Sequence, residues 1–268
     1  MDSNLRYTST MAQNIPKVSI ITVTFNREQY IREAIDSVLA QSFKDWEMVI
    51  VDDASTDNTE RIVKDYIDGE SRIKYFKNKE NLGIARTRNR GLELARGIYI
   101  APLDSDDLWL DVNKLQKQID FLDVNKDYSM LGGGIMRIDA HSKPIKKVLF
   151  PVYDSLIRKI CLQFNPFPQS TLMYRKSIAL DCGGYSTEYK ICDDYDLWLK
   201  IGLQSKFTNI PQVLAGYRVH GGNITKTKRL TTAKEILDIV WNYRTKYPRA
   251  YIGLAKAYVR LLLAYVRT

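Results

Sequence analysis

The sequence predicts an α/β fold in which helices cover a mostly parallel central sheet. Strand-like and helix-like segments alternate regularly between residues 17 and 103, as expected for parallel strands joined by crossover helices. From residue 111 to residue 225 the alternation is less regular. We therefore expect a regular first half, residues 17–110, joined to an irregular second half, residues 111–225.

Four strands are expected in the first half. Each is rich in apolar and β-branched residues at successive positions, which is typical of a strand buried on both faces. They cover residues 17–26, 46–53, 72–78 and 97–103. Apolar residues at helical spacing, with cap residues such as Asn81 and Gly83, indicate helices over 27–41, 60–67 and 81–95. The carboxyl ends of such strands are where ligands bind in open α/β sheets.

The second half contains fewer clear elements. We expect strands over 130–138, 170–174 and 213–220, and helices over 154–163 and 195–203. Two further helical stretches, separated by Pro248, follow within residues 226–268. Residues 1–16 form a polar extension without the apolar run of a signal peptide.

The net charge of +9 is concentrated in residues 226–268. This segment carries ten basic and two acidic residues, a net +8, so residues 1–225 carry only +1. In the last helix, 249–266, a basic stripe of Arg249, Lys256 and Arg260, continued by Arg267, lies beside an apolar face. Two interpretations stay open: a helix packed on the core with a solvated stripe, or an interfacial helix on an anionic lipid surface. The charge of the segment favours the second.

The composition argues against several classes of protein. Three cysteines without a CxxC pair, together with two histidines, argue against a disulfide framework and a zinc site. No stretch near twenty residues is free of charge, so a membrane span is not expected. These features favour a cytoplasmic protein.

Three groups of carboxylates follow or flank expected elements. They are Asp52 and Asp53 after the second strand, Asp104, Asp106 and Asp107 after the fourth, and Asp193 and Asp194 before a helix. If the second and fourth strands are neighbours, two of these groups share one pocket. Clustered carboxylates repel one another unless a cation joins them, and hard oxygen ligands suit Mg²⁺ or Mn²⁺.

The carboxylates are also compatible with different roles. Asp107 and Asp194 could answer the dipole at a helix N-terminus, and we expect Asp107 to cap a helix that starts at Leu108. A nuclease or phosphatase site is also possible. The residues alone therefore predict a metal-dependent α/β enzyme acting on a phosphorylated or nucleotide substrate.

Four motifs, in this order, resemble the family 2 glycosyltransferases, which are inverting enzymes of the GT-A fold. They are VSIITVTFNREQYIREAIDSVLAQSFKDWEMVIVDDASTDNT, NLGIARTRNRGLELARGIYIAPLDSDDLW, DDYDLWLK and YRVHGGNIT. The resemblance covers roughly residues 17–225. It implies a nucleotide-binding half, 17–110, and an acceptor half, 111–225, followed by a basic amphipathic helical segment, 226–268.

The resemblance implies a UDP-sugar donor and a role for each matching residue. The uracil would lie between Phe25 and Asp53. The remaining residues of the nucleotide pocket would be Val23, Asp52, Arg88, Asp104 and Ser105. Asp106 would be the main ligand of Mn²⁺ or Mg²⁺ with His220 nearby, although a purely structural histidine is as good an interpretation of His220 by itself.

On the acceptor side, the resemblance makes Asp194 the general base that takes the proton of the attacking hydroxyl. Asp193 and Trp198 would contact the acceptor. Asp193 stands where the family usually has Glu, and Val23 where it often has Pro. No QxxRW segment is present, so a processive synthase is not expected. Residues 161–174 have the aromatic and amide content that sugar rings favour, although core packing explains them equally well.

The basic C-terminal segment connects this activity to a lipid surface. We expect a peripheral enzyme on the inner face of a bacterial-type membrane that extends a polyprenyl-diphosphate-linked glycan for O-antigen or capsule assembly. The alternatives are a protein-linked or soluble glycan acceptor, or a sugar-nucleotide-binding protein without turnover. Nucleic-acid binding is not expected, because the basic segment has no known motif or aromatic platform.

Overall fold

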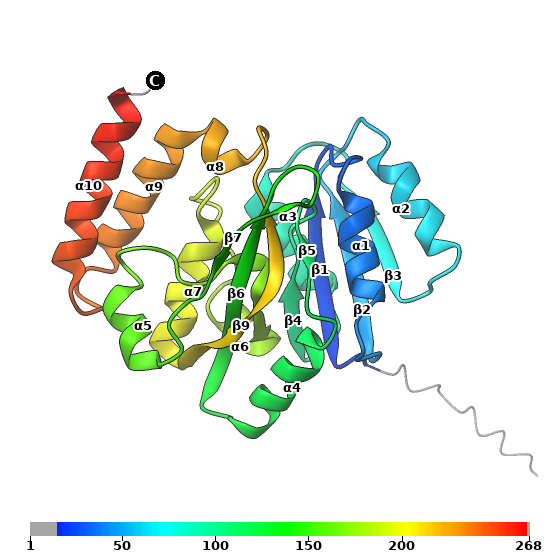
Figure 1. Cartoon of the computed structure of the whole chain (residues 1–268), viewed down its shortest axis with the longest axis horizontal. Helices are drawn as coiled ribbons and strands as arrows, with labels where there is room; N and C mark the ends of the chain where they lie inside the picture. The colour runs from blue at the N-terminus through cyan, green and yellow to red at the C-terminus, as the bar shows by residue number, and fades with distance from the viewer. Residues whose placement is uncertain (1–14, 267–268) are drawn as a thin grey trace, which may run out of the picture.

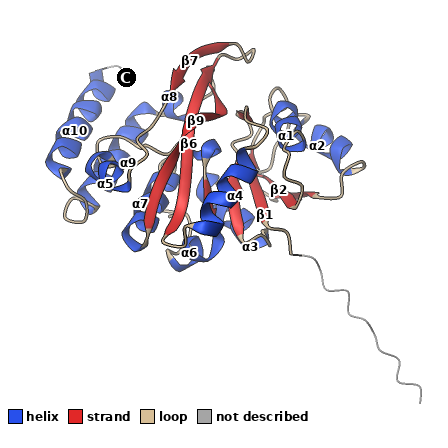
Figure 2. Ribbon diagram, turned by 60° about the horizontal axis from the view of Figure 1, so that its bottom comes forward, coloured by secondary structure: helices blue, strands red, loops and turns tan. Residues whose placement is uncertain are grey.

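The computed structural model describes residues 15–266 and contains one nine-stranded sheet, in the strand order β3-β2-β1-β4-β8-β6-β9-β5, with β7 paired to β6 (Figure 1). Helices cover both faces of this sheet (Figure 2). The expected α/β architecture is confirmed, but only part of the sheet is parallel.

The first half forms the parallel part of the sheet. Its strands are β1 (Val18–Thr24), β2 (Trp46–Asp52), β3 (Ile73–Lys77) and β4 (Tyr99–Pro102). The helices between them are α1 (Ile31–Leu39), α2 (Thr59–Ile67) and α3 (Ile84–Leu94). Each matches an expected element. However, β1 lies between β2 and β4, so these two strands are not neighbours. Because all three run parallel, their carboxyl ends still meet at one edge.

The second half is mixed in direction. Its strands are β5 (Leu108–Trp109), β6 (Tyr128–Ile138), β7 (Pro144–Val148), β8 (Met173–Arg175) and β9 (Lys206–Arg218). Its helices are α4 (Lys114–Val124), α5 (Asp154–Ile160), the 3₁₀ turn η1 (Gln169–Thr171), α6 (Lys176–Asp181) and α7 (Asp193–Gln204). Antiparallel β8 joins β4 to β6 and thereby ties the two halves into one sheet.

Strand β6 runs parallel to β9 through a stretch of three glycines. A Cβ atom on Gly133 would lie only 2.4 Å from Leu214 Cδ1, so glycine permits this close approach. The expected strand over 213–220 is only the end of β9, which begins at Lys206. The first residues of the expected strand over 170–174 belong to η1 instead.

The C-terminal segment packs on the body of the molecule. It consists of α8 (Ile224–Thr227), α9 (Arg229–Asn242) and α10 (Ala250–Val266), which lie at the end opposite α2 (Figure 1). Ile239 and Val240 of α9 and Ala257 of α10 belong to the same buried cluster as Trp198 of α7. The segment therefore completes a hydrophobic core rather than extending from it.

Helix α10 has two different faces. Its small residues Gly253, Ala257 and Ala264 are buried, whereas Leu262 and Val266 are 66% and 84% exposed. The packing interpretation of this helix is thus confirmed, and an exposed apolar face remains. Arg267, the last residue of the basic stripe, and residues 1–14 of the polar extension lie outside the described residues. Within residues 15–266, no helix is long and apolar enough to cross a bilayer.

Candidate active site

A cavity of about 830 Å³ opens at the carboxyl ends of the parallel strands. The first half and the loop after β4 supply one wall, which includes Val23, Phe25, Asp53, Gly83, Arg88, Asp104, Ser105, Asp106 and Asp107. The second half and the C-terminal helices supply the other, which includes Phe164, Asn165, Gln169, Lys190, Asp194, Tyr217, Lys228, Thr232 and Arg260. Most of the residues expected at the nucleotide site therefore share one cavity.

Asp53 is held in place by the chain that follows β3. Its Oδ1 accepts hydrogen bonds from Asn78 Nδ2 at 2.7 Å and from the Leu82 amide at 2.8 Å, and its Oδ2 accepts one from the Gly83 amide at 2.9 Å. Gly83 has a φ of +85°, which glycine adopts without strain. Phe25 is 42% exposed at the cavity wall, so its ring is open to stacking.

Asp52 stabilises the turn that carries Asp53. It is completely buried, and it accepts hydrogen bonds from the Tyr75 hydroxyl at 2.5 Å and the Ser55 amide at 2.7 Å. It does not line the cavity, so its contribution is to hold the turn after β2.

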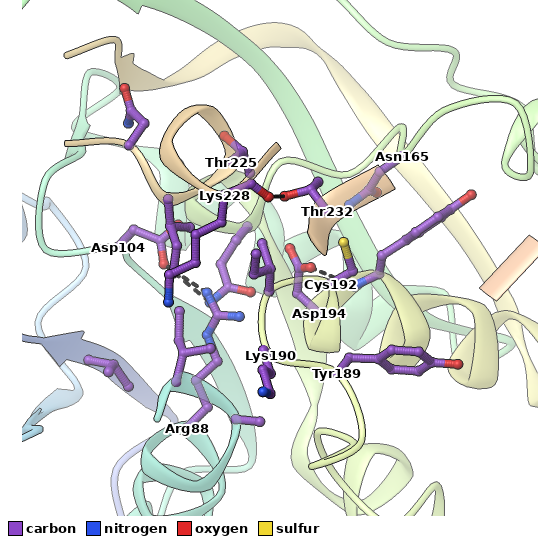
Figure 3. Close-up of a pocket in the computed structure, with 18 of the residues that line it drawn as sticks. Arg88, Asp104, Asn165, Tyr189, Lys190, Cys192, Asp194, Thr225, Lys228 and Thr232 are labelled. Atoms are coloured by element: carbon purple, nitrogen blue, oxygen red, sulfur yellow. Dashed lines mark hydrogen bonds and ion pairs between the residues drawn. The ribbon is translucent and has the colours of Figure 1, made fainter. Parts of the chain in front are cut away.

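Arg88 of α3 joins three elements. Its Nη1 donates to both carboxylate oxygens of Asp193, at 2.9 and 3.0 Å, and its Nη2 donates to Asp104 Oδ1 at 3.2 Å. Burial alone would lower the pKa of Arg88, but the two carboxylates hold it above its ordinary value. Arg88 therefore stays charged and links α3, the loop after β4 and the start of α7 (Figure 3).

Asp106 lines the cavity and pairs with His220, which is not among the lining residues. Asp106 Oδ2 lies 3.0 Å from His220 Nε2 and 3.4 Å from Arg27 Nε. Burial opposes ionisation of Asp106, but the hydrogen bond with His220 and the charge of Arg27 bring its pKa below the ordinary value. The carboxylate is therefore ionised. The expectation that His220 lies beside Asp106 agrees with this geometry.

Asp107 is not a helix cap, and the expectation of a helix from Leu108 is wrong. Leu108 and Trp109 form the short strand β5, which pairs with β9, and the next helix begins only at Lys114. Asp107 is buried and accepts hydrogen bonds from Ser170 Oγ at 2.6 Å and the Arg218 amide at 2.8 Å. Burial raises its pKa well above the ordinary value.

Asp194 lies in the first turn of α7 and lines the cavity from the wall of the second half (Figure 3). Burial raises its pKa to about 7; Arg88 opposes this shift, and the charges of Asp193 and Asp104 add to it. A carboxyl group that ionises near neutral pH can take a proton from a bound hydroxyl.

Two residues expected to contact the acceptor do not line the cavity. Asp193 is completely buried against Arg88, and Trp198 packs in the core between Tyr174 and Tyr185. Neither side chain is open to the cavity, because α7 is buried on almost every side and only its first turn reaches the cavity, so an acceptor contact by Asp193 or Trp198 stays a prediction. The segment 161–174 does line the wall, through residues such as Phe164, Asn165 and Gln169.

Sequence reasoning missed two positioning residues. The carboxylate of Glu235 on α9 accepts hydrogen bonds from the amides of residues 190, 191 and 192, at 2.8, 3.0 and 3.0 Å, immediately before α7. Arg218 is completely buried, and its Nε donates to the Asp106 carbonyl at 2.7 Å. The YRVH motif contains Arg218, but no local pattern marks Glu235.

The comparisons with known proteins agree with this fold and identify a family. The family described as glycosyl transferase family 2 matches residues 19–184. The putative glycosyltransferase EpsE of Bacillus subtilis is 34% identical over 255 residues, which are 92% of this chain and 90% of EpsE. The putative teichuronic acid biosynthesis glycosyltransferase TuaG of the same organism is 48% identical over 107 residues, 40% of this chain and 42% of TuaG.

Solved structures share the same architecture. TarS 1–349 of S. aureus in complex with UDP-GlcNAc superposes with a TM-score of 0.69 at 24% identity, covering 91% of this chain and 72% of TarS 1–349. The mannosyltransferase PcManGT of Pyrobaculum calidifontis, in complex with GDP-Man and Mn²⁺, gives 0.71 at 20% identity, covering 95% and 74%.

Together, the sheet and its likeness to the solved structures define a GT-A fold, and the family match and the curated relative make the chain a glycosyltransferase of that fold. Within this class, the chain belongs to glycosyl transferase family 2.

Proposed function

We propose that this enzyme transfers a sugar from a UDP-sugar to a hydroxyl group of a glycan acceptor, with inversion at the anomeric carbon. The observation that carries the proposal is the single cavity that joins Asp194 to Asp53, Phe25 and Asp106. Burial raises the pKa of Asp194 to about 7, and the same cavity holds the residues that we propose to bind the nucleotide, which supports a base at this position. The UDP-GlcNAc bound in TarS supports a uridine donor.

The chemistry follows from these residues. Phe25 would stack on the uracil while Asp53 accepts its N3 hydrogen. The acceptor oxygen would attack the anomeric carbon as Asp194 takes the hydroxyl proton, and the bond from that carbon to the diphosphate oxygen would break. Because attack and departure occur on opposite faces, one displacement inverts the configuration. This scheme needs no second carboxylate as nucleophile.

A divalent cation fits the donor set of the site. Asp106, ionised, and the adjacent imidazole of His220 offer oxygen and nitrogen ligands of the kind that Mn²⁺ accepts. Within the described residues no group of three His, Cys, Asp or Glu side chains is arranged to hold a metal ion by itself, so donor phosphate oxygens would complete the coordination. When bound, Mn²⁺ or Mg²⁺ would offset the charge of the diphosphate leaving group. The Mn²⁺ bound in PcManGT supports this assignment.

We further propose that the acceptor is a polyprenyl-diphosphate-linked glycan of a bacterial surface polysaccharide. The name of TuaG, a putative teichuronic acid glycosyltransferase, supports this class of pathway. The exposed apolar and basic residues of α10 support a location at the inner membrane surface. A soluble or protein-linked glycan acceptor would need no such surface.

Release of UDP from a panel of UDP-sugars, with and without Mn²⁺, tests the proposed activity. Release of GDP from GDP-mannose is measured alongside, because PcManGT binds GDP-mannose. We expect one UDP-sugar to be turned over only with the metal, and Asp194→Asn to lower turnover by roughly a hundredfold or more while the protein still binds UDP. Binding of UDP-sugars without any turnover would identify a sugar-nucleotide-binding protein instead.

A further inference from the structure

A second cavity, of about 960 Å³, adjoins the active-site cavity at its acceptor end. Both cavities are lined by Asn165, Thr225, Thr232 and Arg260. Figure 3 shows Asn165 and Thr232 beyond Asp194, on the side away from Arg88. A ligand whose reacting end lies at Asp194 could therefore continue into this second cavity, between the C-terminal helices and β6.

The second cavity is strongly cationic. Its lining includes Arg137 of β6, Arg229 of α9, and Lys256 and Arg260 of α10, and no carboxylate lines it among the described residues. None of the four forms an ion pair within residues 15–266. Lys256 Nζ donates only to the neutral Gln163 Oε1, at 3.0 Å. Like charges brought together repel, and a bound anion would relieve this repulsion.

One wall of the cavity is apolar. Ile236 of α9 and Val259 and Leu263 of α10 line it, and the last two are 55% and 50% exposed. The cavity thus offers cations and hydrocarbon side by side. A free phosphate or a phosphodiester polymer would use only the cations, whereas a prenyl diphosphate would use both.

We propose that this second cavity binds the diphosphate of a lipid-linked acceptor, with the first part of its hydrocarbon chain against the apolar wall. Arg229 and Arg260 are the principal phosphate-binding residues. The shared lining residues place this group next to the acceptor hydroxyl that Asp194 activates. The proposal rests on the proposed function for the identity of the acceptor, but the binding site itself can be measured without turnover.

Isothermal titration of the full chain with farnesyl diphosphate, in saturating UDP, tests the site directly. UDP fills the nucleotide pocket, so any remaining binding reports a second site. We expect Arg229→Gln with Arg260→Gln to weaken binding by about tenfold or more, the effect of removing two charge-assisted contacts. The matched control is Arg244→Gln with Lys246→Gln, which removes the same charge from residues outside both cavities and should leave binding unchanged.

Inorganic pyrophosphate in the same titration distinguishes the source of the phosphate. Weaker binding of pyrophosphate than of farnesyl diphosphate supports the lipid-linked acceptor, and equal binding would overturn the role of the apolar wall. Equal losses in the two double variants, complete displacement by UDP, or tighter binding of a DNA oligonucleotide would each overturn the site. UDP binding by the same protein is measured separately, so a failure of the proposed donor function is recognised on its own.

Discussion

Asp194 and Arg88 show how burial gives two charged residues of one site different properties. Arg88 is buried with carboxylates on two sides, which keeps it charged and fixed. Asp194 lacks such an ion pair within the described residues, and burial brings its pKa to about 7. One residue is thereby suited to hold the site together and the other to exchange a proton.

Replacing Asp194 by Asn should remove the base and leave the fold intact. We expect turnover of the active UDP-sugar to fall by roughly a hundredfold to ten-thousandfold, the usual contribution of general base catalysis. The affinity for UDP should not change, because the nucleotide pocket lies at Phe25 and Asp53. Steady-state kinetics and UDP titration check this. Undiminished transfer by the variant would assign the base role elsewhere.

The same carboxyl group predicts a pH dependence. A base must be deprotonated to work, so turnover should rise about tenfold per pH unit below about 7 and level off above it. Folding raises this pKa from the ordinary 3.8, so ionisation of Asp194 costs stability as pH rises from 3.8 to about 7. Thermal unfolding of Asp194→Asn should lose less stability across that window. Parallel curves for the variant and the parent would contradict the shift.

The Arg88 pair predicts a loss of stability when one partner is removed. Arg88→Met leaves Asp193 completely buried without its counter-charge, which should reduce the free energy of unfolding by about 3–5 kcal/mol. Arg86→Met is the matched control, because Arg86 is exposed on the same helix. Urea unfolding of both variants measures the difference. Equal midpoints would show that the pair contributes little.

At the scale of elements, the sequence predicted the helices and strands whose apolar pattern is set by neighbouring residues in the chain. The alternation of buried strands and amphipathic helices predicted β1 to β4 and α1 to α3, and the carboxyl ends of β2 and β4 brought Asp53 and Asp106 to one cavity. The order of the strands in the sheet was not predictable in this way, because it depends on whether each connecting helix places the next strand on one side of the growing sheet or on the other. The two-residue strand β5 was missed for a related reason: it exists only through its pairing with β9.

The partners of residues that act across long separations could not be predicted from the local sequence, even for Arg218, which lies in a motif. Glu235 binds amides that lie 43 to 45 residues earlier, and Arg218 binds a carbonyl 112 residues earlier. The prediction for Trp198 relied on a local pattern that did not indicate its position. This residue belongs to the same motif as the proposed base Asp194, yet its ring packs against Tyr174 and Tyr185 in the core. Membership of a motif therefore did not separate residues that support the site from residues that line it.

Helix α9 holds the turn before the proposed base Asp194, although α9 lies outside all four motifs. Glu235 accepts three backbone hydrogen bonds from the turn that precedes α7, and a glutamine there would keep one oxygen and lose the charge. We expect Glu235→Gln to lower kcat by roughly tenfold to a hundredfold through misplacement of Asp194, with unchanged UDP affinity. The control is Glu188→Gln, an exposed carboxylate near the same turn. A lower melting temperature with unchanged kcat would show a purely structural role.

At the scale of the whole molecule, the C-terminal helices belong to the catalytic body. Ile239, Val240 and Ala257 are buried in the cluster around α7, and Arg260 lines the active-site cavity. Deleting residues 226–268 would therefore expose a hydrophobic core and remove part of the cavity wall. Membrane attachment must be tested by point substitutions that leave this core intact.

The exposed face of α10 supplies such substitutions. Leu262→Ser with Val266→Ser removes two apolar side chains that point away from the core, and Leu180→Ser with Val124→Ser makes the same exchange elsewhere, at residues that are 50% and 79% exposed. If α10 lies on an anionic lipid surface, the Leu262→Ser, Val266→Ser variant should bind phosphatidylglycerol vesicles about tenfold or more weakly. The reason is that each substitution removes the free energy gained when an apolar side chain moves from water into the lipid. The second pair should bind as the parent does.

Salt provides the second arm of this experiment. The basic residues of α9 and α10 attract anionic lipid by screened electrostatics, so raising the salt concentration should weaken binding of the parent and of both pairs. Vesicles of phosphatidylcholine alone should bind weakly throughout. Equal binding by both double variants, or binding that ignores lipid charge, would show that α10 serves only to pack on the core and to line the two cavities.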